Sequence, residues 1–126
     1  MPDQHHEQVA RQIVSASYHV HRTLGPGLLE SVYETCLAYE LSRRGLCCKR
    51  QTSIAIVYEQ LRFEEGFRLD LLVEDIVICE LKSVDVLLPV HTAQIITYLR
   101  LTGKRLGFLI NFNVPVIKQG IKRLIL

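Results

Sequence analysis

The chain has 126 residues, the usual size of one domain, which leaves room for a single hydrophobic core. Hydrophobic residues make up 48% and charged residues 22%, a balance that excludes an intrinsically disordered chain. The net charge of +2 is small but uneven: residues 1–85 carry 9 basic and 13 acidic side chains (−4), and residues 86–126 carry 6 basic and none acidic (+6). Such a distribution suits a region that binds a polyanion, and it equally suits a solvated basic face.

The sequence lacks the patterns that are typical of membrane-spanning and of secreted proteins. No apolar run approaches the roughly 20 residues of a membrane span, and the first residues lack the basic-then-apolar pattern of a secretory signal. The four cysteines show no zinc-ligand spacing, and two of them, Cys47 and Cys48, are adjacent. We therefore expect reduced thiols, a cytoplasmic location and no membrane partner. The oligomeric state stays open, with a homodimer as one option.

Two helices are predicted at the start of the chain. Apolar residues recur at helical spacing from about residue 5 to residue 23, and the sequence Gly25-Pro26-Gly27 ends this pattern. A second helical pattern follows and stops at Arg43-Arg44-Gly45, because basic residues and a glycine are typical of a helix C-terminus.

The middle of the chain has the composition and alternation of strands. Thr52–Tyr58 is β-branched and aromatic, and Phe67–Val73 alternates between two faces. Ile76–Ser83 is a further strand candidate, and Glu74-Asp75 fits a tight turn before it. The alternation places four apolar residues on one face: Phe67, Leu69, Leu71 and Val73.

The last third of the chain returns to a helix and then to strands. Pro89–Leu101 is predicted to be helical and to end at Gly103, Leu106–Phe112 is a buried strand, and a short strand lies near Ile121–Leu126. The predicted order is α-α-β-β-β-α-β-β. It indicates one α/β domain over residues 1–126, with a mixed β-sheet flanked by helices.

Three charged residues stand where the strand pattern favours apolar side chains. Asp70 lies within Leu69–Val73, and Glu80 and Lys82 lie within Val77–Lys82. Burial of an unpaired carboxylate costs several kcal/mol, so these groups need a partner, a metal ion or exposure in a cleft.

A hairpin through the Glu74-Asp75 turn would place Asp70 across from Glu80 and Lys82 on one face. Two carboxylates and an ammonium at short range suit Mg²⁺ or Mn²⁺, and the lysine could hold or help deprotonate a metal-bound water. A structural ion pair between the lysine and one carboxylate explains the same spacing. Both interpretations stay open at this point.

Two of the predicted helices carry further candidate site residues. Glu30 and Tyr33 lie three residues apart on one side of the second helix, although a glutamate is also favoured at a helix N-terminus by the dipole. In the later helix, His91, Gln94 and Tyr98 share one face, which could equally be a polar solvent face.

The order of these motifs closely resembles that of a known family. The motifs, in chain order, are Gly27-x-x-Glu30-x-x-Tyr33, Phe67-Arg68-Leu69-Asp70, Glu80-Leu81-Lys82, Gln94-x-x-x-Tyr98 and Leu109-Ile110-Asn111-Phe112. Over residues 8–126 the chain resembles the GxxExxY protein family, which is grouped with the PD-(D/E)xK nuclease-like superfamily. The resemblance implies a restriction-endonuclease-like core.

The resemblance also implies catalytic and metal-binding roles. Asp70 and Glu80 look like the metal-binding carboxylates of the nuclease core, and Lys82 looks like its catalytic lysine. Glu30 looks like the helical glutamate that completes the acidic cluster, so the implied metal set is Asp70, Glu80 and Glu30. Leu69 stands where the motif's name has a proline, a departure that many superfamily members share.

Substrate contacts are implied at four further positions. Gln94 and Tyr98 are similar to a Gln-x-x-x-Tyr element that contacts the substrate near the metal in related nucleases. Arg68 and Tyr33 belong to the matched motifs and are expected to contact the substrate as well.

The expected function is a Mg²⁺- or Mn²⁺-dependent nuclease that hydrolyses nucleic acid, DNA in the first place, with little sequence readout. One alternative is a catalytically silent module that keeps the nuclease fold and binds nucleic acid or protein. Another is a structural protein with an internal ion-pair network. A metal ion that raises the melting temperature would separate the enzyme from the silent module.

Overall fold

The computed structural model describes residues 2–126, and its elements follow the predicted order. Five strands form a single mixed sheet with the order β1-β2-β3-β4-β5, in which β3 and β4 are parallel and the other neighbours antiparallel. The α/β class and the mixed sheet are therefore confirmed. The elements are α1 (Gln4–Leu24), α2 (Glu30–Arg43), β1 (Cys48–Tyr58), β2 (Leu61–Val73), β3 (Val77–Lys82), α3 (Pro89–Thr102), β4 (Leu106–Asn111), the 3-10 helix η1 (Ile117–Gly120) and β5 (Ile121–Ile125).

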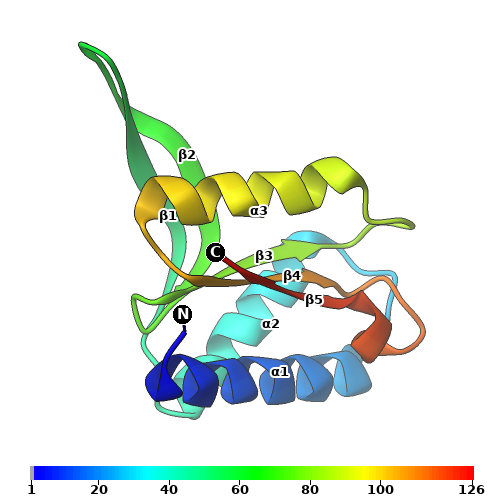
Figure 1. The fold of residues 1–126 in the computed structure, drawn as a ribbon. Helices are drawn as coiled ribbons and strands as arrows, with labels where there is room; N and C mark the ends of the chain where they lie inside the picture. The colour runs from blue at the N-terminus through cyan, green and yellow to red at the C-terminus, as the bar shows by residue number, and fades with distance from the viewer. Residues whose placement is uncertain (1) are drawn as a thin grey trace.

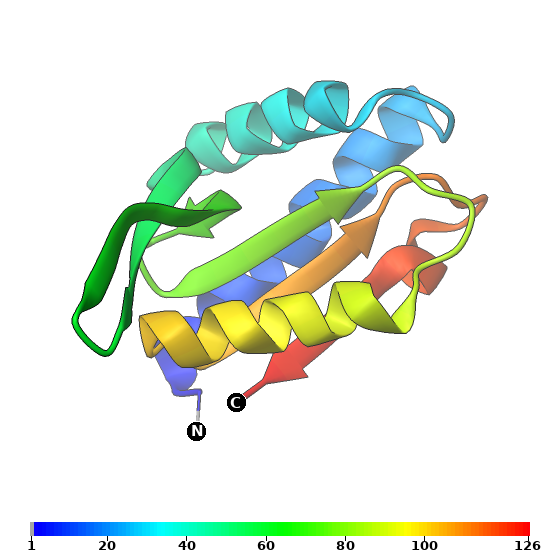
Figure 2. The ribbon, with the colours of Figure 1, turned by 90° about the horizontal axis from the view of Figure 1, so that it is seen from above.

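The sheet lies between two layers of helices (Figures 1 and 2). Helix α3 covers one face, and helices α1 and α2 cover the other. Apolar side chains fill both interfaces, since Leu72 and Ile78 of the sheet are buried with Ile95 of α3, and Ile13 of α1 and Leu37 of α2 are buried on the opposite face. No helix within residues 2–126 has the length and apolar character that a membrane crossing requires.

The turn between β2 and β3 sets the register of these two strands. Glu74 and Asp75 both have positive φ, at 53° and 60°, as the two central residues of a type I′ hairpin turn require. Val73 pairs with Val77 directly beside this turn. The predicted tight turn is therefore confirmed, and it aligns the carboxyl-terminal half of β2 with β3.

The alternation along β2 differs from the prediction. Leu69 and Leu72 are buried on the α3 side, whereas Leu71 and Val73 are buried with α1 and α2. The expectation that Phe67, Leu69, Leu71 and Val73 share one face is therefore wrong. The phase of the alternation changes between Leu69 and Leu71, where β2 separates from β3.

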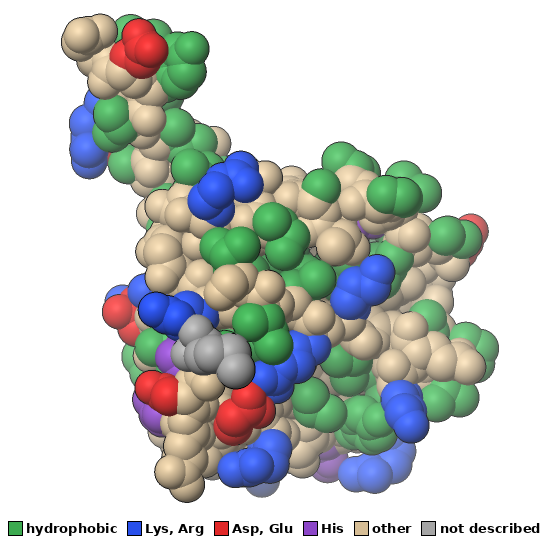
Figure 3. Space-filling view, in the orientation of Figure 1, with side chains coloured by type: hydrophobic (Ala, Val, Ile, Leu, Met, Phe, Trp, Pro, Cys, Tyr) green, Lys and Arg blue, Asp and Glu red, His purple; other side chains and the backbone are tan. Residues whose placement is uncertain are grey.

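Strands β1 and β2 are also longer than predicted, and together they form a projecting hairpin (Figures 1 and 3). We call residues 55–66 the hairpin arm. The pairing shifts between Ile54 and Ile56, because three residues of β2 lie opposite the single residue Ala55. Gly66 fits there because a Cβ at this position would come within 2.3 Å of the Ile56 Cγ1.

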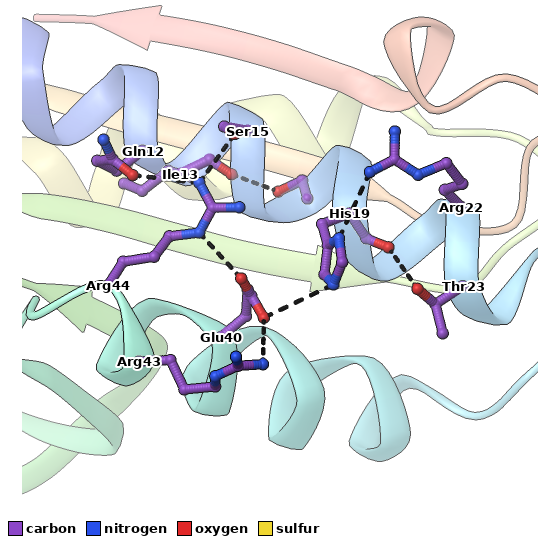
Figure 4. Close-up of polar contacts among 10 residues, drawn as sticks. Gln12, Ile13, Ser15, His19, Arg22, Thr23, Glu40, Arg43 and Arg44 are labelled. Atoms are coloured by element: carbon purple, nitrogen blue, oxygen red, sulfur yellow. Dashed lines mark hydrogen bonds and ion pairs between the residues drawn. The ribbon is translucent and has the colours of Figure 1, made fainter.

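A polar network at the end of α2 holds this helix to α1 (Figure 4). The Arg44 guanidinium donates from Nε to Glu40 Oε2 (3.0 Å) and from Nη1 to Ser15 Oγ (2.8 Å) and Gln12 Oε1 (3.1 Å). Arg43 Nη1 lies 3.8 Å from Glu40 Oε1. The network fixes the helix layer beneath the sheet.

Candidate active site

Two carboxylates meet at the point where β2 leaves β3. The main-chain pairing of these strands ends at Leu71–Cys79. Beyond this pair, hydrogen bonds to carboxylate side chains join the two strands. The Asp70 N–H donates to Glu80 Oε2 (3.1 Å), and the Leu81 N–H donates to Asp70 Oδ2 (2.9 Å). Each carboxylate thus accepts a hydrogen bond from a main-chain N–H of the opposite strand. We call this point, where β2 and β3 separate, the fork. Asp70 and Glu80 lie side by side on adjacent strands, as the hairpin argument expected.

The electrostatics of this pair are unfavourable without an added cation. Glu80 is only 5% exposed, and burial, followed by the negative charge of Asp70, raises the pKa of Glu80 to about 9. Within residues 2–126, neither Asp70 nor Glu80 forms an ion pair with a basic side chain. At neutral pH the pair therefore needs a proton, or a cation in its place.

Lys82 lies two residues after Glu80 on the same strand, at the level of Asn111 on β4. Its side chain is half-buried, and its charge acts to lower the Glu80 pKa, more weakly than burial and Asp70 raise it. No ion pair of Lys82 occurs within the described residues 2–126. A closed lysine–carboxylate pair, the structural alternative, is thus not formed.

Helix α3 brings Tyr98 close to the carboxylate pair. The Tyr98 ring stacks on Phe67 of β2, with ring centroids 4.4 Å apart. Burial raises the pKa of Tyr98, the charges of Glu80 and Asp70 raise it further, and a hydrogen bond with Gln94 opposes this effect. Gln94 itself is exposed. Tyr98 therefore lies within electrostatic reach of both carboxylates, and Gln94 lies one helical turn before it.

A second glutamate of α2, which the sequence analysis did not single out, reaches this site through Gln51. Glu34 is 8% exposed, and its carboxylate accepts from Gln51 Nε2 (2.6 Å) and Arg50 Nε (3.1 Å). The same Gln51 amide nitrogen lies 3.3 Å from Asp70 Oδ1. Glu34 could have been found as the residue one helical turn after Glu30, whereas nothing in the sequence marks Gln51.

Glu30 does not join the carboxylate pair as predicted. It is the first residue of α2, and its side chain is exposed. Among the side chains of residues 2–126, no three His, Cys, Asp or Glu residues assemble as a metal-binding group. The expected set of Asp70, Glu80 and Glu30 is therefore not formed, because Glu30 lies at the helix start, where the dipole favours an acid.

Tyr33 has a structural position rather than the predicted substrate contact. Its ring is fully buried and stacks on Phe112, with centroids 4.6 Å apart. Its hydroxyl donates to the Gly25 carbonyl (2.6 Å) and accepts from the Leu28 N–H (3.1 Å). Gly27, between these residues, has φ 96°, which favours glycine. The Gly27 and Tyr33 positions of the motif therefore shape the loop that leads into α2.

Two further candidates, Arg68 and His91, lie beside the hairpin arm and at the start of α3, respectively. Arg68 is exposed at the base of the hairpin arm, and no ion pair of its side chain occurs within residues 2–126. His91 Nδ1 accepts from the Leu88 N–H (3.0 Å) and so caps the start of α3. Substrate contact by Arg68 stays a prediction.

The residues at the fork fit a hard divalent cation. Mg²⁺ is commonly bound through one or two carboxylates, with water molecules as its remaining ligands. Asp70 and Glu80 provide two such groups, and their mutual repulsion makes a cation favourable there. The donor set therefore suits Mg²⁺ or Mn²⁺ better than zinc, which favours nitrogen and sulfur ligands.

Fold and site together define the class of this protein: an α/β domain of the restriction-endonuclease type, with an acidic site where two central strands separate. The family model of the PD-(D/E)XK nuclease superfamily matches residues 7–124, and the chain belongs to this superfamily. No curated protein and no solved structure matches the chain significantly. The predicted superfamily is thus confirmed.

Proposed function

We propose that this protein is a Mg²⁺- or Mn²⁺-dependent nuclease that hydrolyses phosphodiester bonds, in DNA in the first place. The observation that carries the proposal is the Asp70–Glu80 pair, which is largely buried and lacks a cationic partner within residues 2–126. Groups whose pKa is strongly shifted by burial and a like charge are typical of functional sites. Membership of a nuclease superfamily supports the same function.

The roles of the site residues form part of this proposal. Asp70 and Glu80 hold the metal ion, which would neutralise charge at the scissile phosphate and supply an activated water. Lys82, which forms no ion pair within residues 2–126, orients the attacking water and stabilises negative charge in the transition state. Gln94 and Tyr98 contact the substrate beside the pair.

Two residues complete the proposed site from outside the metal set. Arg68 binds a phosphate next to the scissile one, because its guanidinium is exposed and positively charged. Glu34 takes the place expected for Glu30, acting as a positioning residue that orients Asp70 through Gln51.

Substrate recognition is proposed to depend on the nucleic-acid backbone. The six basic and no acidic residues of positions 86–126 favour phosphate binding without base readout. We also propose that the chain belongs to the GxxExxY branch of the superfamily, since the loop before α2 uses both Gly27 and Tyr33. A cytoplasmic location is part of the same proposal.

Cleavage assays test this function directly. The purified chain is incubated with single- and double-stranded DNA and RNA in Mg²⁺, Mn²⁺ or EDTA, beside the Asp70→Asn variant. We expect cleavage of DNA in Mg²⁺ or Mn²⁺, none in EDTA, and a loss of about 10²-fold or more in the variant. Binding of nucleic acid without cleavage, equal in both proteins, would instead support the catalytically silent module.

A further inference from the structure

The two edges of the sheet differ in how well they are protected against pairing with another strand. Strand β5 has only five residues and contains Lys122 and Arg123. Arg123 forms an ion pair with Glu7 of α1, which ties this edge to the helix layer. Short length and charged side chains are the usual means of blocking an edge strand, so the β5 edge is protected.

The opposite edge, strand β1, has such protection at its start, where Lys49 and Arg50 are charged and Arg50 pairs with Glu34 of α2, but not from Gln51 onward. It has 11 residues, and the eight from Gln51 to Tyr58 contain no charged residue and no proline. Within residues 2–126, β1 pairs with β2 on one side only. The extra residues at the pairing shift belong to β2, so residues 52–58 of β1 remain extended, beyond the left-handed Gln51. A long, uncharged edge of this kind is a template for another strand.

The hairpin arm also exposes apolar side chains next to this edge. Figure 3 shows hydrophobic side chains along the projecting arm, away from the body of the molecule. Val57 and Tyr58 of β1 are 61% and 66% exposed, and Leu61 and Phe63 of β2 are 58% and 52% exposed. Contiguous apolar groups on a projecting element are typical of an interaction surface.

We infer that the outer edge of β1 pairs with the same edge of a second copy of this chain, antiparallel and about a two-fold axis. Identical strands suit this geometry because a two-fold contact brings the same surface of each subunit together. If Ile54 pairs with Ile54 of the second copy, then Thr52 pairs with Ile56, and neutral residues lie opposite neutral residues throughout this stretch. The two sheets then form one continuous sheet across the axis.

The charges at the ends of β1 favour this partner. In the same register Lys49 of one copy lies opposite Glu59 of the other, and the symmetry repeats this contact at the far end. Lys49 is exposed and has no ion pair within residues 2–126, so its charge is available for this contact. The basic base of one arm therefore meets the acidic tip of the other.

A nucleic acid fits the arm less well than a second copy does. Residues 55–66 contain three acidic side chains (Glu59, Glu64 and Glu65) and one basic side chain (Arg62), a net charge of −2. Phosphate groups would be repelled by this surface, whereas main-chain hydrogen bonds between two neutral strands are unaffected by it. The inference is independent of the nuclease proposal, because it concerns residues outside the carboxylate pair.

Sedimentation equilibrium from about 1 to 300 μM tests the dimer on the full chain without any activity measurement. We expect a monomer–dimer equilibrium for the parent chain and a dissociation constant raised at least tenfold by Ser53→Lys, which places a charge in the neutral stretch. Ile125→Lys, at an exposed position on the β5 edge, is the matched control and should leave the dimer unchanged.

Glu59→Lys supplies a second variant, at an exposed turn residue outside β1, and should weaken the dimer most at low salt. Hydrogen exchange of the parent chain locates the contact: amides within residues 52–57 should become more protected as concentration rises. A monomer at every concentration would overturn the inference. A dimer that both Ser53→Lys and Glu59→Lys leave intact would also overturn it, as would concentration-dependent protection confined to another region.

Discussion

Glu40 and Glu80 are both poorly exposed glutamates, but the structure surrounds them in opposite ways. The Glu40 side chain is 12% exposed and lies within 4.0 Å of Arg44, Arg43 and His19 (Figure 4). Its hydrogen bond with Arg44, aided by these nearby charges, lowers the Glu40 pKa. Basic side chains of the protein itself balance the negative charge of Glu40, and the role of this carboxylate is to join α2 to α1.

Glu80 faces a second carboxylate instead of a cation. Its hydrogen-bonding neighbour is Asp70, and its pKa is raised to about 9. A protein that needed Glu80 only for stability would pair it with a base, as it pairs Glu40, or replace it with an apolar residue. The difference between the two glutamates therefore distinguishes a structural carboxylate from one placed for a cation that the chain does not supply.

Cleavage gives the largest expected difference between the two glutamates. Glu80→Gln removes a metal ligand and should lower the rate of cleavage in Mg²⁺ by about 10²- to 10³-fold. Glu40→Gln, the matched control, removes the same charge from the helix interface and should change the rate by less than about twofold. Cleavage rates of both variants on one DNA substrate check this. Equal losses would show that activity depends on the helix layer rather than on the fork.

The pH dependence of stability should also separate the two residues. A raised Glu80 pKa means that the folded, metal-free protein binds one more proton than the unfolded chain between pH 4.5 and about 9. Stability then falls as pH rises through this range, by at most about 1.4 kcal/mol per pH unit, and Glu80→Gln should flatten the curve.

Glu40 should act with the opposite sign. Its lowered pKa stabilises the fold above pH 4.5, and this contribution is lost as pH falls through the folded pKa. Glu40→Gln should therefore change only the acid end of the curve. Denaturant titrations in EDTA at several pH values measure both effects. A Glu80→Gln curve that is parallel to the parent's would contradict the raised pKa.

Metal-free stability at one neutral pH gives a smaller difference with the same logic. Glu80→Gln should leave the free energy of unfolding unchanged or raise it, since glutamine resembles the protonated acid and needs no proton uptake on folding. Glu40→Gln should lower it by about 1 kcal/mol through loss of charged partners. Thermal melts in EDTA compare the two. A loss of about 3–5 kcal/mol on Glu80→Gln would instead indicate a buried structural ion pair.

The sequence predicted the elements well because each has its own local pattern. The helical spacing before Gly25, the tight turn at Glu74-Asp75 and the apolar run at Leu106–Asn111 all appear where expected, within a few residues. Asp70 and Glu80 could be placed together for the same reason: one short turn and the two-residue period of strands determine their register.

The remaining errors come from contacts that cross the fold. Leu69 and Leu71 point to opposite layers because β2 leaves β3 at Asp70, and alternation alone contains no sign of that separation. Glu30 and Glu34 share one helix face, so only the position of β1 selects Glu34. The motif that contains Tyr33 predicts a substrate contact, yet the Tyr33 hydroxyl donates its hydrogen bond to the Gly25 carbonyl in the preceding loop.

The smallest expected effect concerns Gln51. This residue connects Glu34, which is paired with Arg50, to Asp70, which has no ion pair within residues 2–126. Its amide lies between Glu34 and Asp70, and its φ of 48° is in the left-handed region, where a non-glycine residue is strained by about 1 kcal/mol. Gln51→Ala and Gln51→Gly both remove the amide, so each should reduce cleavage by the same factor of about three to ten. Gln51→Gly relieves the backbone and should be more stable than Gln51→Ala by about 1 kcal/mol. Paired cleavage assays and denaturant titrations measure both quantities. If the glycine variant cleaved at the parent rate, the backbone conformation, and not the amide, would be what orients Asp70.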